Sequence, residues 1–273
     1  MKLPRPKKAL GQNFLVDQGV LGRIVAAVDL APDDRVLEVG PGRGALTRLL
    51  AERAAAVLAV ELDRQLVPLL TAEFADRPSV EVLQSDILRL DVTALFAERG
   101  GGTWKVAANL PYNISSQVLF KFLDERRLFS RMVLMLQREV GERLLATPGG
   151  KEYGILSVLF PMFFMVRREC IVRPGAFFPP PKVDSMVLSF VPLEAPRFPL
   201  SDEALFRRVV KASFGQRRKT LWNCLKGGAF VPTDEGLREL LAACGIDPVR
   251  RGETLSLEEF ARLANRLATA GLA

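Results

Sequence analysis

The 273-residue sequence is basic and almost half hydrophobic, with a formal net charge of +7 and 49% hydrophobic residues. This length and composition predict a packed core divided between one large domain and a smaller one, and the basic balance favours a polyanionic partner such as nucleic acid, although a generally basic surface would have the same charge. No apolar run is long enough to span a membrane and the N-terminal segment lacks the apolar stretch of a signal peptide, so we expect a cytoplasmic protein.

The first half of the chain alternates predicted strands and helices. The strand "RVLEV" is followed at once by the loop "GPGRG", the helical pattern "ALTRLLAERA" and a second strand, "AVLAVELD"; these segments are residues 35–39, 40–44, 45–54 and 56–63. An apolar strand that leads through a glycine-rich turn into a helix is typical of a ligand-binding edge in a doubly wound sheet. Such an edge binds nucleotide-like cofactors.

The glycine-rich turn narrows the choice of cofactor. Gly40, Gly42 and Gly44 allow close approach of a ligand to the backbone, although they could also serve only a tight turn. Glu61 ends the second strand about twenty residues further on, where a carboxylate can accept hydrogen bonds from two ribose hydroxyls. The turn lacks the G-x-G-x-x-G pattern of dinucleotide binders, and Pro41 removes a donor that a pyrophosphate would use. We therefore favour S-adenosylmethionine, which carries no phosphate.

Two further strands are predicted to end at the same edge of the sheet. The segment "VEVLQSDIL", residues 80–88, brings Asp86 to accept from an adenine amino group and Ile87 to lie along the ring. Asp86 could instead cap the following helix. The segment "WKVAANLPY", residues 104–112, then brings Asn109 beside the cofactor.

The absence of histidine and the cysteine spacing restrict the chemistry. Without histidine there is no Ser-His-Asp triad, no histidine base and almost no route to a catalytic zinc site. Cys170, Cys224 and Cys244 are scattered and lack C-x-x-C spacing, so we expect buried, inert thiols and no metal. Catalysis must then depend on positioning and hydrogen bonding.

Four motifs in order give the sequence a specific resemblance. "VLEVGPGRGALT", "SDIL", "NLPYNIS" and "FFPPPKVDS" resemble those of the ribosomal RNA adenine N6-dimethyltransferases, from about Gln12 to the last helix. Within that family the chain looks most like the bacterial small-subunit enzymes, which modify two adjacent adenosines near the 3′ end of 16S rRNA. The resemblance also implies that Gln12, Asn13 and Leu15 lie over the methionine end of the cofactor; the pattern of "GQNFL" alone would suggest the start of a helix.

The loop "NLPYNIS", residues 109–115, contains no acid, base or thiol, and an adenine amino group needs none. Its nitrogen is a poor nucleophile with protons to donate, so two aimed acceptors would hold it and favour a more tetrahedral, electron-rich form. We expect the Asn109 side-chain oxygen and the Leu110 carbonyl, fixed by Pro111, to be these acceptors, and Tyr112 to offer a face to the base. A turn-forming Asn-x-Pro with a core tyrosine is the alternative.

The proline-rich segment "GAFFPPPKVDS", residues 175–185, is predicted to present an aromatic ring to the extruded base. The resemblance assigns the stacking role opposite the tyrosine to Phe177, and we expect Phe178 in the core. "MVLMLQ", "ECIVRP" and "SMVLSFVPL" complete a sheet of about seven strands, with an antiparallel edge expected partly by analogy.

The sequence therefore predicts an α/β fold: a class I, Rossmann-like methyltransferase with a mainly parallel seven-stranded sheet, plus a small C-terminal all-helical domain. We expect the methyltransferase domain with a basic N-terminal arm over residues 1–192, a linker over 193–200, and a helical RNA-binding domain over 201–273. Ser256 and Glu259 form a predicted capping box at the last helix. The basic residues expected to follow RNA phosphates, which could also be a solvated helix face, are Arg207, Arg208, Lys211, Arg217, Arg218 and Lys219.

The leading hypothesis is an S-adenosylmethionine-dependent dimethyltransferase that acts on 16S rRNA in the small ribosomal subunit or its precursor.

 We expect this enzyme to act as a monomer. Alternatives are a ribosome-assembly factor whose main role is binding, a large-subunit rRNA adenine methyltransferase that confers macrolide resistance, and a DNA adenine methyltransferase. Ile155 and Pro161 stand where relatives often carry arginine and glutamine, which leaves the local RNA contacts open.

Overall fold

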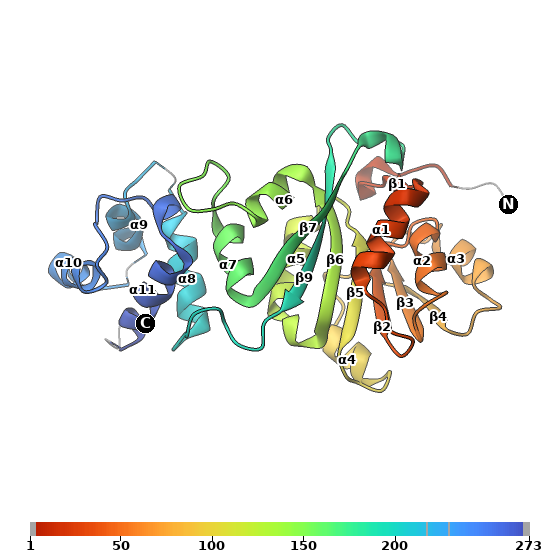
Figure 1. The fold of residues 1–273 in the computed structure, drawn as a ribbon, viewed down its shortest axis with the longest axis horizontal. Coiled ribbons are helices and arrows are strands. Elements are labelled where there is room, and N and C mark those ends of the chain that lie inside the picture. The colour runs from red at the N-terminus through yellow and green to blue at the C-terminus, as the bar shows by residue number, and fades with distance from the viewer. Residues whose placement is uncertain (1–3, 217, 229, 270–273) are drawn as a thin grey trace. The chain divides into compact units, whose positions relative to one another are not determined.

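The computed structural model of this chain describes residues 4–216, 218–228 and 230–269. The chain forms two compact units, and Figure 1 colours them along the sequence. The first, here called the sheet unit, comprises Met1–Gly141 and Val166–Pro192. The second, here called the helical unit, comprises Glu142–Met165 and Leu193–Ala273. The helical unit therefore includes a segment from the middle of the chain as well as the C-terminal part.

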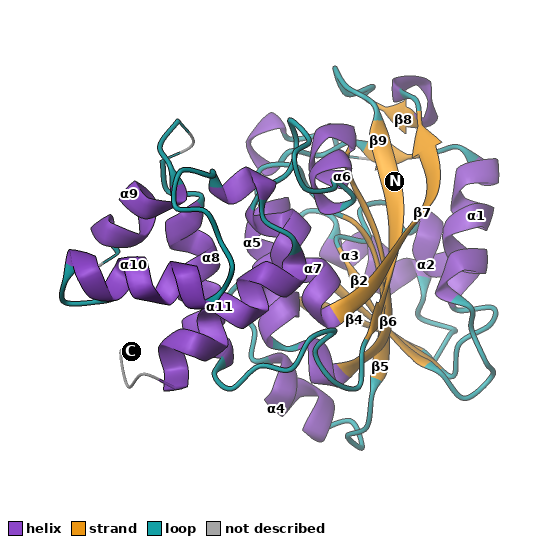
Figure 2. Cartoon of the chain, turned by 60° about the vertical axis from the view of Figure 1, so that its left-hand side comes forward, coloured by secondary structure: helices purple, strands orange, loops and turns teal. Residues whose placement is uncertain are grey.

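A seven-stranded, mainly parallel sheet is the centre of the fold (Figure 2). Its strands are β2 (Arg35–Val39), β3 (Ala56–Glu61), β4 (Val80–Gln84), β5 (Trp104–Asn109), β6 (Phe129–Gln137), β7 (Phe164–Val172) and β9 (Ser185–Pro192). Their order is β4-β3-β2-β5-β6-β9-β7. The pairs from β4 to β6 are parallel and β6 pairs with β9 antiparallel, so the predicted fold class and its antiparallel edge are confirmed.

The helices of the sheet unit follow from local sequence signals. They are α1 (Gln18–Val28), α2 (Ala45–Leu50), α3 (Val67–Glu73), α4 (Val92–Ala97), α5 (Ser115–Asp124) and the first part of α6 (Arg138–Leu144), with short 3-10 turns η1 (Lys8–Leu10), η2 (Arg126–Leu128) and η3 (Pro174–Ala176). The Asp17 carboxylate caps α1 by accepting from the Val20 N–H, and the Asp91 carboxylate caps α4 in the same way. Helix α1 packs against β5, β6 and β9. The inner strands are buried almost throughout, as parallel strands covered on both faces require.

A small second sheet joins the N-terminal segment to the proline-rich segment. Strand β1 (Phe14–Leu15) pairs antiparallel with β8 (Phe177–Phe178), so "GQNFL" contains a strand rather than the start of a helix. Leu15 and Phe177 are paired and buried in the core, at 6% and 4% exposure. Phe178 is 54% exposed, and our expectation that it lies in the core was wrong. The reason is the alternation of side chains along a strand, which turns Phe178 away from the face that Phe177 occupies.

The helical unit is built from α7 (Ile155–Phe163), α8 (Glu203–Ser213), α9 (Leu221–Gly227), α10 (Asp234–Ala243) and α11 (Leu257–Thr269), with the 3-10 turn η4 (Gly252–Thr254). The predicted capping box at α11 is confirmed, because Glu259 N–H donates to Ser256 Oγ and Ser256 N–H donates to the Glu259 carboxylate. Pro161 lies inside α7. Among the described residues, no helix combines the length and apolarity needed to cross a membrane.

Candidate active site

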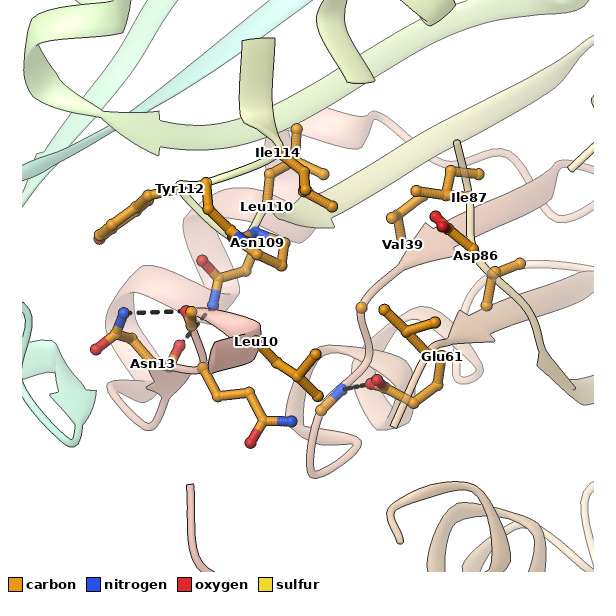
Figure 3. Close-up of a pocket in the computed structure, with 18 of the residues that line it drawn as sticks. Leu10, Asn13, Val39, Glu61, Asp86, Ile87, Asn109, Leu110, Tyr112 and Ile114 are labelled. Carbon is orange, nitrogen blue, oxygen red and sulfur yellow. Dashed lines mark hydrogen bonds between the residues drawn. The ribbon is translucent and has the colours of Figure 1, made fainter. Parts of the chain in front are cut away.

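One cavity of the sheet unit collects most of the predicted site residues (Figure 3). Its walls come from the N-terminal segment, the glycine-rich loop, the ends of β3 and β4, and the loop after β5. The predicted residues that line it are Gln12, Asn13, Gly40, Gly42, Glu61, Asp86, Ile87, Asn109, Leu110, Pro111 and Tyr112. Leu15 and Phe177 do not line it, because both pack in the hydrophobic core.

Glu61 is held in place by backbone donors at the end of β3. Its Oε2 accepts from the Gly42 N–H at 3.1 Å and its Oε1 accepts from the Asp63 N–H at 2.8 Å. Burial raises the pKa of Glu61, while these hydrogen bonds oppose the shift. Each carboxylate oxygen can accept more than one hydrogen bond, so both retain capacity for hydroxyl groups of a bound ribose.

The glycines at positions 40 and 42 serve different purposes. A Cβ on Gly40, which has a φ of +69°, would meet only the Asn109 carbonyl oxygen at 3.9 Å, so it would take up space at the cavity wall. A Cβ on Gly42 would lie 2.8 Å from the Phe14 ring. Gly40 thus leaves room for a ligand, whereas Gly42 allows the loop to pack against β1.

Asp86 closes its own turn as well as lining the cavity. Its Oδ1 accepts from the Leu88 N–H at 3.0 Å, and its Oδ2 lies 3.7 Å from Arg89 Nε. This hydrogen bond closes a turn and does not cap the following helix, α4, which Asp91 caps, so the alternative that we considered for Asp86 is not what the structure shows. It does not exclude a ligand role, because the side chain is still 31% exposed and reaches the cavity beside the buried Ile87.

Asn109 is the last residue of β5, and its side chain is oriented by the N-terminal segment. Its Nδ2 donates to the Asn13 carbonyl oxygen at 2.9 Å, which leaves Oδ1 as the acceptor on the other side of the amide. Figure 3 shows this oxygen on the side of the Tyr112 ring. The Leu110 N–H donates to the Met135 carbonyl of β6 at 3.2 Å, so the start of the loop is tied to the sheet.

Tyr112 is half-buried, and hydrogen bonds hold both its hydroxyl and its backbone carbonyl. Its hydroxyl lies 2.7 Å from Ser185 Oγ, and its carbonyl accepts from Ser115 Oγ at 3.1 Å. Burial raises the pKa of Tyr112. Ser185 begins β9 and is fully buried, so the "NLPYNIS" loop and the "FFPPPKVDS" segment meet at this hydrogen bond. Sequence reasoning missed Ser185, although it ends a motif that carried the family resemblance.

Asp63 anchors the N-terminal segment beside the cavity and was also missed. Its carboxylate binds Lys7 Nζ at 2.6 Å and Gln12 Nε2 at 2.8 Å. Although burial by itself raises it, the pKa of Asp63 lies below its usual value because Lys7, Gln12 and the Gln65 N–H donate to the carboxylate. The sequence feature that could have identified Asp63 is its position as a second acidic residue, two residues after Glu61.

Glu38 is a buried acid under the glycine-rich loop. It is 2% exposed, and its Oε2 has no hydrogen-bond partner among the described residues. Burial raises the pKa of Glu38 to about 8; the nearby Glu61 adds to the shift and Thr47 opposes it. It borders a smaller hollow together with Phe14, Gly40 and Asn109. The sequence feature that could have identified Glu38 is the presence of an acidic residue within the otherwise apolar end of the strand "RVLEV".

We expect Glu38 to make stability depend on pH. Its carboxyl titrates near 4.5 when unfolded and at about 8 when folded, so the folded state binds the extra proton between these values. The free energy of unfolding should therefore fall as pH rises through this window, by up to about 1.4 kcal/mol per pH unit. Glu38→Gln should flatten this dependence in urea titrations. Glu81→Gln, which alters a surface pair with Arg99, should keep the wild-type slope, and equal slopes in all three proteins would contradict the assignment.

The predicted RNA-binding cations lie in the helical unit. Arg208, Lys211, Arg218 and Lys219 are exposed, and Arg217 lies outside the described residues. Arg207 is half-buried: it pairs with Glu203 at 2.7 Å and its guanidinium lies over the Phe163 ring. Its predicted contact with RNA, like that of the others, stays a prediction.

Comparison with solved structures defines the class of this protein. A dimethyladenosine transferase from Plasmodium falciparum superposes with a TM-score of 0.83 at 26% identity, covering 95% of this chain and 98% of that one. The 23S rRNA methyltransferase ErmE gives a TM-score of 0.70 at 25% identity, covering 94% of this chain and all of the other. The fold and the cavity at its strand ends are those of an S-adenosylmethionine-dependent methyltransferase with a Rossmann-like sheet.

Sequence comparison defines the family. The family model described as "Ribosomal RNA adenine dimethylase" matches residues 4–269. A "Ribosomal RNA small subunit methyltransferase A" of Geobacter metallireducens is 62% identical, covering 98% of this chain and 97% of the relative. The protein with the same name in Geobacter sulfurreducens is 63% identical over the same shares. The chain belongs to the ribosomal RNA adenine dimethylase family, so the predicted resemblance is confirmed.

Proposed function

We propose that this enzyme transfers methyl groups from S-adenosylmethionine to N6 of two adjacent adenosines near the 3′ end of 16S rRNA. The observation that carries the proposal is the Asn109 amide, which Asn13 orients so that an acceptor oxygen stands beside Tyr112, in the same cavity as Glu61. The full-length similarity to small-subunit methyltransferases supports small-subunit rRNA rather than large-subunit rRNA or DNA as the substrate.

The residues around the cavity suit the cofactor. Glu61 would accept from the ribose hydroxyls, Asp86 from the adenine amino group, and Ile87 would lie along the adenine ring. Gly40 leaves space at the wall, as the position of its missing Cβ indicates. The other residues that we assign to cofactor binding are Gln12, Asn13, Gly42 and Asn109. Leu15 packs in the core and does not line this cavity, so we do not assign it to the cofactor. When bound, the cofactor supplies a methyl group on a positively charged sulfur.

The protein's part in the reaction is to hold an amine. The Asn109 oxygen and the Leu110 carbonyl would accept the two N6 protons of the target adenine, and Pro111 would keep that carbonyl in place. Acceptors that are already oriented need no reorganisation during the reaction, which makes such polarity effective in catalysis. No proton has to leave before the nitrogen attacks, so the lack of a general base is consistent with this chemistry. Tyr112 would stack on the base. Phe177 is 4% exposed, packs in the hydrophobic core and does not line the cavity, so we do not assign it to the opposite side of the base.

RNA binding is assigned chiefly to the helical unit. We place methyl transfer in residues 1–192 and RNA binding in 201–273, with 193–200 as the linker. The exposed cations of α8 and of the segment before α9 would contact phosphates. The target adenosine must leave its stack to reach the cavity, at a cost of a few kcal/mol. We further propose a monomer that acts in the cytoplasm on the small subunit or its precursor.

A direct assay tests this function. The enzyme is incubated with methyl-labelled S-adenosylmethionine and unmethylated small subunits, and the RNA is digested to nucleosides. We expect labelled N6,N6-dimethyladenosine from small subunits and none from large subunits treated in parallel. Label in large subunits alone, or no dimethyladenosine at all, would contradict the proposal.

A further inference from the structure

One face of the β1–β8 pair carries two phenylalanine rings, one in the cavity wall and one exposed. Phe14 and Phe178 are directly opposite each other in the antiparallel pair. Residues opposite each other in such a pair project from the same face of the sheet. Phe14 lines the cavity, so Phe178 lies on the cavity-facing side, next to a residue of the cavity wall. Unlike Phe14, it is 54% exposed.

Arg43 orients this exposed ring. It follows Gly42 in the glycine-rich loop, and its guanidinium carbon lies 4.6 Å from the centre of the Phe14 ring and 5.5 Å from that of Phe178. Its Nη2 donates to the Pro4 carbonyl oxygen at 3.1 Å, which fixes the guanidinium further. Phe178 is therefore a positioned ring rather than a loosely attached one, and cation–π contacts of this kind are favourable.

An exposed aromatic ring beside an arginine can bind an unpaired nucleobase by stacking. Bases that leave a stack are bound on aromatic side chains and on arginine planes, and this stacking tolerates any base. We propose that Phe178 and Arg43 form a second base-stacking site, which receives an unpaired RNA nucleobase neighbouring the adenosine in the cavity. This inference rests on the proposed function, because it assumes an RNA substrate.

The charges around the ring favour RNA as the occupant. Lys182 is exposed in the same proline-rich segment. Arg5 is also exposed, and it follows Pro4, whose carbonyl oxygen accepts the hydrogen bond from Arg43. The acidic residue of the segment, Asp184, is already paired with Arg138 and Arg173. Positive charge next to an aromatic ring suits a base together with its flanking phosphates.

Steady-state methylation of unmethylated small subunits tests the site with Phe178 variants. We expect Phe178→Ala and Phe178→Leu to raise the KM for subunits by about five- to twentyfold, because both remove the aromatic face. The kcat and the Kd for S-adenosylhomocysteine should stay within about twofold of wild type. Phe178→Trp should retain the wild-type KM. Met165→Ala, which alters a residue that is 58% exposed in β7, is the control for lost apolar surface.

The results separate this inference from the proposed function. A wild-type enzyme that does not methylate small subunits would defeat the function itself. An active wild type with an unchanged KM in Phe178→Ala, or an equal rise in Met165→Ala, would overturn only the stacking site. Protein-free 16S rRNA, added as an inhibitor, identifies the partner: its Ki should rise in Phe178→Ala as the KM does. A raised KM with an unchanged Ki would place Phe178 against a ribosomal protein and overturn the proposal.

Discussion

Asn109→Ala is expected to lower the kcat for dimethylation by about 10²- to 10³-fold, the effect of losing one oriented hydrogen-bonding group at a reacting centre. The variant loses the oxygen that we assign to the N6 proton and also the bond from Nδ2 to the Asn13 carbonyl. Single-turnover methylation of small subunits measures the loss. The Kd for S-adenosylhomocysteine, measured by calorimetry, should change by less than about tenfold, because Asn109 is one of several groups around the cofactor.

Asn109→Asp sharpens this test. A carboxylate keeps an acceptor oxygen for the amine, but it cannot donate to the Asn13 carbonyl, which would then face a negative oxygen. We expect this variant to remain well below wild type. If Asn109→Asp were fully active, orientation by Asn13 would not matter. If Asn109→Ala kept the wild-type kcat, the assignment of Asn109 as a catalytic acceptor would fail.

The same alanine variant separates catalysis from a binding role in subunit assembly. The exposed cations of the helical unit are unchanged in Asn109→Ala, so its affinity for small subunits should match that of wild type. An inactive protein that binds subunits and delays their maturation would support a release step that depends on methylation.

Glu61→Ala is expected to weaken binding of S-adenosylhomocysteine by about 10- to 100-fold, because hydrogen bonds to a charged group are lost. It also leaves the Gly42 and Asp63 N–H groups without the acceptor that fixes the loop. Isothermal titration calorimetry gives the affinity. Glu81→Ala removes a glutamate from the neighbouring strand, where it pairs with Arg99 at the surface, and should leave the affinity unchanged.

The pH dependence of cofactor binding provides an independent check on Glu61. Because burial raises its pKa and the ionised carboxylate is the better acceptor, wild-type affinity should increase as pH rises through the titration of this group. Glu61→Gln cannot ionise and should lose that dependence. An unchanged pH profile in Glu61→Gln would assign the titration to another group.

The pattern of the sequence was sufficient for the sheet and for much of the cavity. Apolar runs that end in Glu61, Asp86 and Asn109 predict parallel strands, and parallel strands bring their carboxyl ends to one edge. The capping box at Ser256 and Glu259 is likewise a local signal, and it was predicted correctly. These features depend on residues close together in the sequence, where spacing and residue type are informative.

The tertiary structure decided the features that depend on distant contacts. Phe177 and Phe178 are adjacent and chemically identical, so only their pairing with Leu15 and Phe14 determines which ring is buried. Asp63 acquires its role from Lys7 and Gln12, and Tyr112 is fixed by Ser185, far along the chain.

The sequence by itself therefore determined the class of fold, the family and the edge at which the cofactor site lies, because strand periodicity and loop composition are local properties. Only the tertiary structure decided how Asn109 is oriented, which phenylalanine is exposed and why the pKa of Glu38 is raised. Those outcomes depend on burial and on hydrogen bonds between segments that only the folded chain brings together.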